Sequence, residues 1–413
     1  MAMYDTIRLP FVLTAQNSWH IHQLDVKSAF LNGFVHEKIY VEQPDGVVAL
    51  GKEDYVYLLR KTLCGLKQTH RAWYETMDKH LTKLGFVRNN MLVIGNQPGL
   101  IQSFKDEMNK VFEMTDLRVT KYFLGMEVKD HLEWQVLSER YEPLQDASVI
   151  NFVDYSLNQG APAGHESAET PIGHESTPMT TSEKLSKDDC SEKIDEGLYR
   201  SLIGSLLYLT TSRPNILFVV SVLSRFMHSP SEKHFSATKR VLRYIKETVA
   251  LRVQFSKSAK CDLKLLGYSN NDWEGCVDDS RSTSGYLFSL GLGFFTWSSK
   301  KQETTTQFIV EAEYIVVASA VNQVSILKNL MFHGRTKYIK IKYHFIREVQ
   351  QSNEVLLVHC SSKNQLADIF TKPLPMEMFE ALKQKIGVCH PDAKEKCSIV
   401  GIPDSKPRRL SLS

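Results

Sequence analysis

The sequence predicts a chain of mixed helix and strand, α+β in its first part and closer to α/β in its last, with a polar segment between them. In the last part, residues 263–269, 285–290 and 293–298 have strand character and precede a long apolar-rich helix at 311–330. Residues 131–198 differ from both flanks because they are rich in proline, threonine and charge and carry Gly-His-Glu-Ser twice. They predict a linker between two folded parts.

Composition narrows the class of protein. The 413 residues are enough for two or three domains, and a hydrophobic share of 42% with a charged share of 23% is ordinary for a globular protein. The formal net charge is only +3. Any affinity for phosphate must therefore be local, because no general basic bias is present.

Cysteine usage and hydropathy predict an intracellular protein, in the cytoplasm or the nucleus. The seven cysteines are scattered and never spaced as Cys-x-x-Cys, which favours reduced thiols and no disulfide-linked partner. The longest apolar stretch, Leu202–Leu223, is interrupted by Arg213-Pro214 and is not expected to cross a bilayer. The N-terminus has no signal pattern of charge followed by apolar residues. We therefore expect no membrane partner.

The N-terminal part reads as mixed helix and strand. A helix is expected over Thr69–Phe86 because Trp73, Met77, Leu81 and Leu84 recur at helical spacing. It is followed by a short strand at 91–94, a turn, a helix near 100–112 and a strand ending at Val128.

A basic helix is predicted after the linker. Ser229-Pro230-Ser231-Glu232 is a capping-box pattern with proline at the first helical position. The residues expected to face inward are Phe235, Val241, Leu242 and Ile245, and those expected to face outward are Lys239, Arg240, Arg243 and Lys246. The basic residues are candidate phosphate contacts, and the alternative is an ordinary solvated face.

A second basic stretch follows the long helix at 311–330. Its candidate phosphate contacts, which would be independent of base sequence, are Arg335, Lys337 and Lys340. A solvated face is again the alternative. A strand at Val355–Cys360 and a helix opening at Asn364 complete the pattern. Three antiparallel strands followed by alternating helix and strand is the element order of the ribonuclease H-like fold.

Four acidic residues stand out as candidate metal ligands. Asp272, Glu313 and Asp368 are far apart in the chain, and a two-metal phosphodiesterase site gathers such scattered carboxylates on the scissile phosphate. Asp25 ends a predicted strand just before a helix, where a carboxylate could reach a metal at the sheet edge. Spacing alone does not distinguish Asp25, and by itself it is better explained as a residue that starts a turn near a helix.

Ten motifs in a fixed order carry a resemblance to a known family. They are Gln23–Gly33, Leu63–Gln68, Trp73–Tyr74, Lys121–Glu127, Ser201–Tyr208, Thr211–Pro214, Ser282–Tyr286, Trp297–Lys301, Glu311–Tyr314 and Ala367–Leu374. Together they resemble the reverse transcriptase and ribonuclease H region of a plant copia-type retrotransposon Pol polyprotein. The resemblance covers most of residues 3–128 and 176–388.

The resemblance implies a domain plan. Residues 1–130 would form a truncated, palm-type reverse transcriptase domain without most of its fingers, and residues 131–198 a degenerate linker. A helical connection would follow at 199–255 and an incomplete ribonuclease H-like domain at 256–388. The tail at 389–413 matches nothing in the family.

The resemblance also implies catalytic and metal-binding roles. In the palm, Asp25 takes the position of the first of three acids that bind two magnesium ions. The other two belong to a Tyr-x-Asp-Asp hairpin expected just before Met91, where Asn89-Asn90 stand instead. Either substitution or deletion would produce this difference.

In the ribonuclease H part, Glu313 and Asp368 match the acids of the first and last helices. The first-strand acid is replaced by Asn270, and Asp272 lies two residues on, hence on the same strand face, where it could partly substitute. The fourth-strand acid, expected before His333, is absent.

These differences from the family pattern predict that the ancestral activity is lost. The family synthesises DNA on RNA and degrades the RNA of the hybrid with Mg²⁺, so RNA, DNA or their hybrid are the implied partners. With half its carboxylates, this chain is predicted to be an inactive remnant, because too few carboxylates hold magnesium weakly. The alternatives are a non-catalytic nucleic-acid-binding remnant, or an unexpressed or misannotated gene model.

Overall fold

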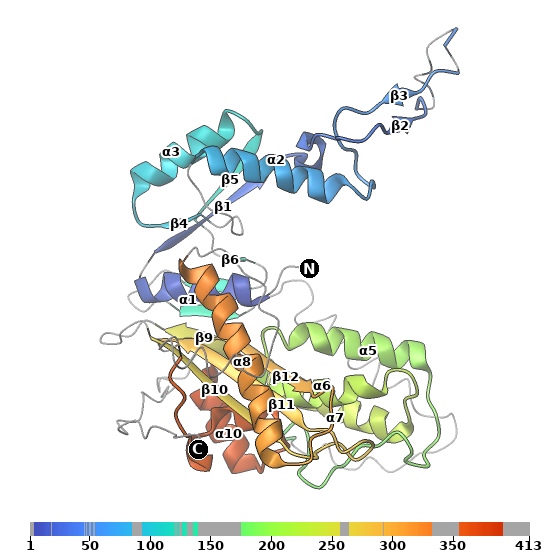
Figure 1. Cartoon of the computed structure of the whole chain (residues 1–413), viewed down its shortest axis with the longest axis vertical. Coiled ribbons are helices and arrows are strands. Elements are labelled where there is room, and N and C mark those ends of the chain that lie inside the picture. Colours follow the sequence, from blue (N-terminus) through green and yellow to red (C-terminus); the bar gives the residue numbers. More distant parts are fainter. Residues whose placement is uncertain are drawn as a thin grey trace. The chain divides into compact units, whose positions relative to one another are not determined.

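The computed structural model describes two compact units (Figure 1), one of Trp19–Thr120 and one of Met1–Ser18 with Lys121–Ser413. The residues described are 4–17, 19–44, 46, 48, 51–52, 54–84, 93–119, 122–123, 126–129, 135–138, 175–256, 264–291, 293–332 and 355–390. Everything below about structure concerns these residues.

The Trp19–Thr120 unit is built on a small antiparallel sheet in the order β4-β1-β5. Its elements are β1 (His20–Val26), η1 (Ala29–Asn32), β2 (Tyr40–Val41), β3 (Tyr57–Leu58), α2 (Thr69–Lys83), β4 (Val93–Gly95), α3 (Pro98–Asn109) and β5 (Met114–Val119). The helix predicted from Thr69 is confirmed as α2. Its apolar face buries Met77 against Met108 and Phe112, with Trp73 and Leu81 packed on the same cluster.

The larger unit contains two further sheets, β10-β11-β12 and β13-β9-β8-β7-β6. Its strands are β6 (Tyr122–Phe123), β7 (Met126–Lys129), β8 (Gln135–Ser138), β9 (Arg252–Ser256), β10 (Leu265–Asp272), β11 (Thr283–Leu290), β12 (Gly293–Lys301) and β13 (Val388–Cys389). Its helices are α1 (Tyr4–Asn17), α5 (Glu196–Leu209), η2 (Pro214–Ile216), α6 (Leu217–Leu223), η3 (Ser224–Phe226), α7 (Glu232–Glu247), α8 (Ile309–Phe332), η4 (Ser362–Asn364), η5 (Leu366–Phe370) and α10 (Met376–Lys385).

Helix α1 packs with the C-terminal sheets, although the sequence predicted one domain from residue 1 to 130. Phe11, Val12 and Ala15 are fully buried, and α1 contacts β12 and β9. The buried Arg8 guanidinium donates hydrogen bonds to the carbonyl oxygens of Phe295, at 3.1 Å, and Thr211. It also lies 3.7 Å from the centroid of the Trp297 ring. These contacts explain why the division falls after residue 18.

The predicted helical connection consists of α5, α6 and α7. The four α7 residues predicted to face inward are all buried. The predicted start of α7 at Pro230 is early, because Ser231 is the N-cap and His234 completes the capping box. Arg213 and η2 separate α5 from α6 within the apolar stretch Leu202–Leu223.

Part of the predicted linker is folded. Strand β8 pairs with both β7 and β9. Thr177 and Met179 are buried, and the Ser231 hydroxyl of the α7 cap donates a hydrogen bond to Asp189. Residues 175–195 therefore belong to the packed unit, and the poorly matched remainder, 139–174, lies outside the described residues.

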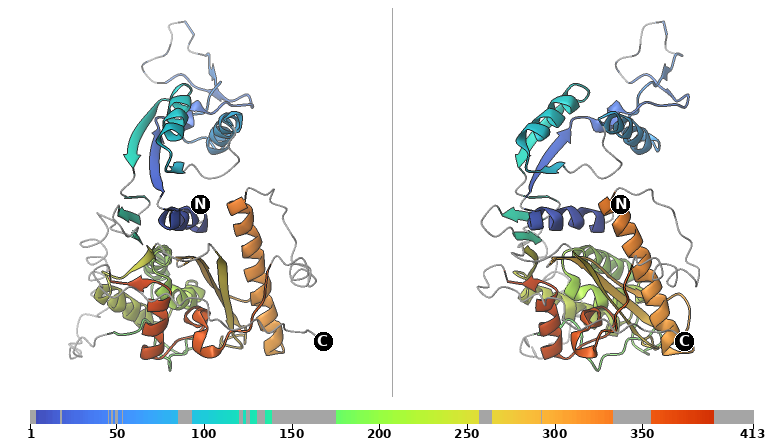
Figure 2. Two further views of the ribbon diagram at one scale, coloured as in Figure 1. Left: turned by 90° about the vertical axis from the view of Figure 1, so that its left-hand side faces the viewer. Right: turned by 60° about the vertical axis from the view of Figure 1, so that its left-hand side comes forward.

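The predicted run of three strands is confirmed as the continuous antiparallel sheet β10-β11-β12. Helix α8 lies against β10 and β11 (Figure 2). Two predictions differ from the structure. Val355–Cys360 forms no strand, and the turn that carries Asp368 is the 3₁₀ helix η5 rather than the start of an α-helix.

One described segment meets the length and composition requirements of a membrane span. It is Ile309–Leu327 in α8, rather than the Leu202–Leu223 stretch singled out from the sequence. These criteria are also met by core helices of soluble proteins, and 39% of the segment is buried inside the fold. Its packing against β10 and β11 explains the apolar character of the buried part.

Candidate functional site

The predicted palm acid lies in the Trp19–Thr120 unit. Asp25 is exposed on the central strand β1, where it pairs with Thr115 of β5. The positions just before Met91, where the resemblance places the other two palm acids, lie outside the described residues.

Asn270 and Asp368, by contrast, are in direct contact in the larger unit. The Asn270 amide donates hydrogen bonds to Asp368 Oδ1, at 2.6 Å, and to Thr371 Oγ1, at 3.0 Å. The turn carrying Asp368 is fixed to β10 by Gln365, whose amide donates to the Ser269 carbonyl at 3.0 Å. The first-strand position and the last-helix position of the predicted acidic site are therefore adjacent, 98 residues apart in sequence.

A glycine on β11 makes this approach possible. Gly285 is the partner of Asn270 in the sheet. A Cβ atom on Gly285 would lie 2.7 Å from Thr371 Cγ2 and 2.8 Å from Phe370 Cβ, closer than van der Waals contact allows. Because position 285 has no side chain, η5 can dock on the sheet and bring Asp368 to Asn270.

Both carboxylate oxygens of Asp368 are occupied by donors from the chain itself. Oδ1 accepts from Asn270, and Oδ2 forms an ion pair with Lys372 Nζ at 3.0 Å. Asp368 is 3% exposed. A buried carboxylate needs such partners, and here an amide and an ammonium provide them without a metal ion.

Asp272 lies near this pair, as its position two residues from Asn270 on β10 predicts. Burial raises its pKa, and the negative charge of Asp368 acts in the same direction. The cations of Lys372, Arg225 and Lys184 oppose the rise. Arg225 is itself fixed by a 3.1 Å hydrogen bond to Thr283 of β11. Asp272 therefore faces positive side chains as well as an acid.

Replacing Asp272 by Asn is expected to raise the free energy of unfolding at neutral pH. Because the folded-state pKa lies above the ordinary value of 3.8, stability falls as the pH rises from that value through the folded pKa. The amide removes this loss. Urea unfolding at about pH 3 and about pH 7 should show the larger gain at the higher pH, where the carboxylate is charged. A variant that is no more stable than the wild type at neutral pH would contradict this expectation.

Glu313 lies exposed on α8. Its neighbour Glu311, also exposed, accepts a hydrogen bond from the backbone N–H of Gln307 at 2.9 Å, at the start of the same helix. Across the part of the chain that the structure describes, no three His, Cys, Asp or Glu side chains gather as a metal site would require. Asp368 and Asp272 are near one another, but Glu313 does not complete a set with them.

The predicted basic stripe on α7 is partly neutralised within the chain. Glu175 binds Arg240 Nη1 at 2.6 Å and Arg243 Nη2 at 3.2 Å, and the Arg240 guanidinium also donates to the Thr177 carbonyl. Lys239 Nζ lies 4.4 Å from the centroid of the Phe235 ring, and Lys246 is exposed. Arg335, Lys337 and Lys340 lie outside the described residues.

Sequence reasoning missed Lys372 and Arg225, which supply positive charge at the acidic site. A signal existed for Lys372, because it follows Asp368 by four residues, a spacing typical of ion pairs along a helical turn. Arg225 carried no comparable signal. It reaches the site only because η3 packs near β11, 58 residues further along the chain.

The chain is similar to a reverse transcriptase family and to plant retrotransposon polyproteins. Residues 1–92 match the family model described as reverse transcriptase (RNA-dependent DNA polymerase). The "Retrovirus-related Pol polyprotein from transposon RE1" of Arabidopsis thaliana is 34% identical over 93% of this chain and 28% of its own length. The "Retrovirus-related Pol polyprotein from transposon TNT 1-94" of Nicotiana tabacum is 30% identical over 93% of this chain and 32% of its own length. Over 93% of its length the chain is thus similar to part of the Pol polyproteins of these plant retrotransposons.

The chain thus spans about 28% of the length of the first of these relatives. Among solved structures, the foamy viral protease-reverse transcriptase in complex with RNA/DNA hybrid covers 97% of this chain at 10% identity, with a TM-score of 0.41. A likeness at that level carries no argument about this chain.

The residues described do not fit a pair of magnesium ions. Reverse transcriptases normally use a divalent metal, and magnesium takes six oxygen ligands in an octahedron, usually one or two protein carboxylates with water and substrate phosphates. Here Asp368 has both oxygens engaged by Asn270 and Lys372. A lysine ammonium already neutralises the carboxylate, so the donor set of this site is complete without a cation from solution.

Proposed function

We propose that this chain is a non-catalytic homologue of the reverse transcriptase and ribonuclease H region of copia-type Pol polyproteins. The observation that carries the proposal is the occupation of both Asp368 oxygens by the Asn270 amide and the Lys372 ammonium. Two-metal hydrolysis requires carboxylates that are free to coordinate the ions. At this site one acid has become an amide and another is held by a lysine.

The arrangement around β10 supports a ribonuclease H-like fold for this part of the chain. Three antiparallel strands are followed by a helix packed on the sheet, and the later turn η5 returns an acidic residue to β10. This is the element order predicted from the sequence up to α8. On this proposal the fold keeps the position of the site. The changed side chains no longer support its chemistry.

The partner that this descent supports best is an RNA–DNA hybrid bound through its phosphates. Lys246 is exposed on α7, and the partly buried Arg240 and Arg243 lie on the same helix. Phosphate contacts of this kind do not depend on base sequence. They weaken with added salt because the counterions that binding releases from the nucleic acid then gain less entropy. Binding of a labelled hybrid should therefore fall steeply with added salt, and an affinity that salt leaves unchanged would contradict phosphate contact.

Replacing Glu175 by Gln is expected to tighten binding of the hybrid. The substitution removes the carboxylate that neutralises Arg240 and Arg243, so the positive charge of this helix face rises while Arg240 keeps its hydrogen bonds to Thr177. We expect a gain of about 3–10-fold at low salt, and a salt slope that is steeper by about one to two units. Fluorescence anisotropy of a labelled hybrid across a salt series measures both quantities.

The matched control is Glu232→Gln, which makes the same change of charge in the first turn of α7. It should leave the salt slope nearly unchanged, because Glu232 is exposed and distant in sequence from the arginines. If both variants tighten binding equally, general charge rather than the α7 face is responsible. If neither does, α7 does not contact the hybrid.

A further inference from the structure

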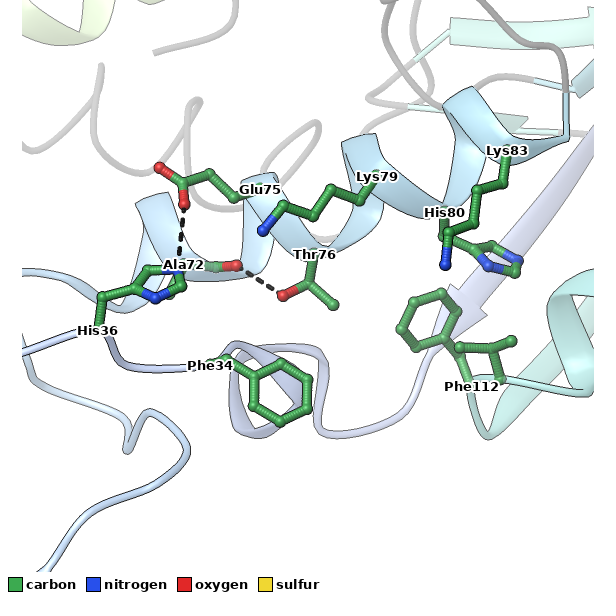
Figure 3. A pocket seen from close by; sticks show the side chains of 10 residues that line it. Phe34, His36, Ala72, Glu75, Thr76, Lys79, His80, Lys83 and Phe112 are labelled. Atoms are coloured by element: carbon green, nitrogen blue, oxygen red, sulfur yellow. Dashed lines mark hydrogen bonds and ion pairs between the residues drawn. The ribbon is translucent and has the colours of Figure 1, made fainter.

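A cavity of about 220 Å³ opens beside α2 in the Trp19–Thr120 unit, and none of the four predicted acids lines it. Its lining combines two aromatic rings, Phe34 and Phe112, with the basic side chains of Lys79, His80 and Lys83. In Figure 3 the two rings lie along one side of the cavity and the lysines extend from α2.

The position of Phe34 follows from the glycine before it. A Cβ atom on Gly33 would lie 2.8 Å from the Trp73 nitrogen and 2.9 Å from the Ala72 carbonyl carbon, so only glycine lets the chain pass this close to α2. The Gly33 carbonyl then accepts a hydrogen bond from Thr62 N–H at 2.9 Å, and Phe34 forms a bridge with Lys61. The backbone is thus anchored while the Phe34 side chain stays 56% exposed.

The part of the wall formed by Phe112 belongs to the hydrophobic core. Phe112 is 4% exposed and belongs to the cluster with Met77 and Met108. Trp73 and His80 meet its ring edge-on, with centroids 5.3 Å and 5.4 Å away. This wall is therefore preformed, which lowers the entropy that a ligand would lose on binding.

The rim of the cavity is positively charged. Lys79 and Lys83 are exposed one helical turn apart on α2, and Lys61 Nζ lies 5.7 Å from the centroid of the Phe34 ring. Like charges at this helical spacing repel one another, and an anion between them relieves the repulsion. The acidic Glu75 is already engaged by Arg71 at 3.0 Å and by His36 at 3.8 Å.

We propose that this cavity binds one nucleotide unit, with its phosphate held by Lys79 and Lys83 and its base stacked on Phe34. Aromatic rings beside basic residues are the combination that holds a base and its phosphate without reading the sequence. The volume of about 220 Å³ is below the range of roughly 300–1,000 Å³ typical of small-molecule sites, so a single unit binds, and weakly. The proposal involves neither α7 nor Asp368 and does not depend on the proposed function.

Isothermal titration of the whole chain with AMP, adenosine and inorganic phosphate tests the two halves of this site separately. AMP is expected to bind with a Kd of roughly 0.1–1 mM, at least about 5-fold more tightly than adenosine or phosphate alone. A short single-stranded oligonucleotide distinguishes the sources of the unit. Tighter binding than AMP indicates a strand, and equal binding indicates a free nucleotide.

Substitutions assign the contacts. Replacing Lys79 and Lys83 together by Ala should weaken AMP at least about 10-fold, and Phe34→Leu about 3–10-fold with no effect on phosphate. These side chains are exposed, so folding should be retained. The control Lys27→Ala removes an exposed lysine of the same unit and should change nothing. Equal AMP affinity in the wild type and the double variant, or no AMP binding at about 10 mM, would overturn the proposal.

Discussion

Asn270→Asp is expected to lower the free energy of unfolding at neutral pH by about 2–4 kcal/mol. The wild-type amide donates to Asp368 at 2.6 Å, and Asp368 is almost fully buried. The substitution removes this donor and places a second carboxylate against the first. Like charges at such a distance cannot both ionise without a large cost.

The loss should shrink on acidification. Repulsion between the two carboxylates raises the pKa of the new pair in the folded state. At low pH one carboxyl group is protonated and donates a hydrogen bond to the other, so the variant loses little stability. As the pH rises both groups ionise, and the loss of stability grows. Urea unfolding at about pH 5 and about pH 7 should therefore show the larger deficit at the higher pH.

Asn271→Asp is the matched control, because it introduces the same charge one residue away on the opposite face of β10. Its effect should stay within about 1 kcal/mol. An equal deficit in both variants would show that charge on β10, and not the contact with Asp368, is responsible. Added MgCl₂ should stabilise Asn270→Asp more than the wild type, because the wild-type carboxylate already has its partners.

Arg8→Ala is expected to lower the free energy of unfolding of the larger unit by about 3 kcal/mol. The wild-type guanidinium donates to the carbonyls of Phe295 and Thr211 and lies over the Trp297 ring. Alanine would leave these buried carbonyls without their donor and remove the ring contact. The same substitution should expose α1 to hydrogen exchange, because Arg8 attaches the helix to the carbonyls of Phe295 and Thr211.

Arg200→Ala provides the comparison within the same unit. Arg200 is about half exposed and pairs with Glu196 at 2.7 Å, so its removal should cost less than about 1 kcal/mol. If the two alanine variants are equally stable, α1 does not depend on Arg8 for its attachment.

Local periodicity predicted much of the fold. The apolar residues of α2 recur at helical spacing and are packed as expected, and the inward face of α7 is buried. The three strands β10, β11 and β12 were also predicted, because strand character is a local property of each segment and does not depend on the strand it pairs with. The cap of α7 was placed early because the sequence offers two serines, and the partner that completes the box is His234 rather than an acid.

Long-range packing could not be predicted in the same way. Nothing in Tyr4–Asn17 reveals that its buried face meets β12 nearly 290 residues later. The apolar residues that open Val355–Cys360 suggested a strand, but a strand also needs a partner, and none is present among the described residues. The repeats and charges of residues 131–198 suggested a linker. In the structure, however, Glu175 and Asp189 bind residues of α7 and of its cap.

The sequence indicated where the residues of the candidate site lie better than it indicated which groups their side chains bind. A period of two puts Asp272 and Asn270 on one face of β10. The structure brings Asp368 into contact with Asn270. What a single sequence does not show is the direction of the hydrogen bond between Asn270 and Asp368. It also does not show that Lys372 and Arg225 bring positive charge where acids were expected.

The most direct test of the proposed loss of two-metal chemistry is cleavage of a labelled RNA–DNA hybrid by the whole chain in the presence of Mg²⁺. The wild-type chain should release no RNA fragments above the buffer background, and Asp368→Ala and Glu313→Ala should give the same result. Cleavage by the wild type that either substitution abolishes would contradict the proposal, because it would show that these carboxylates still support hydrolysis.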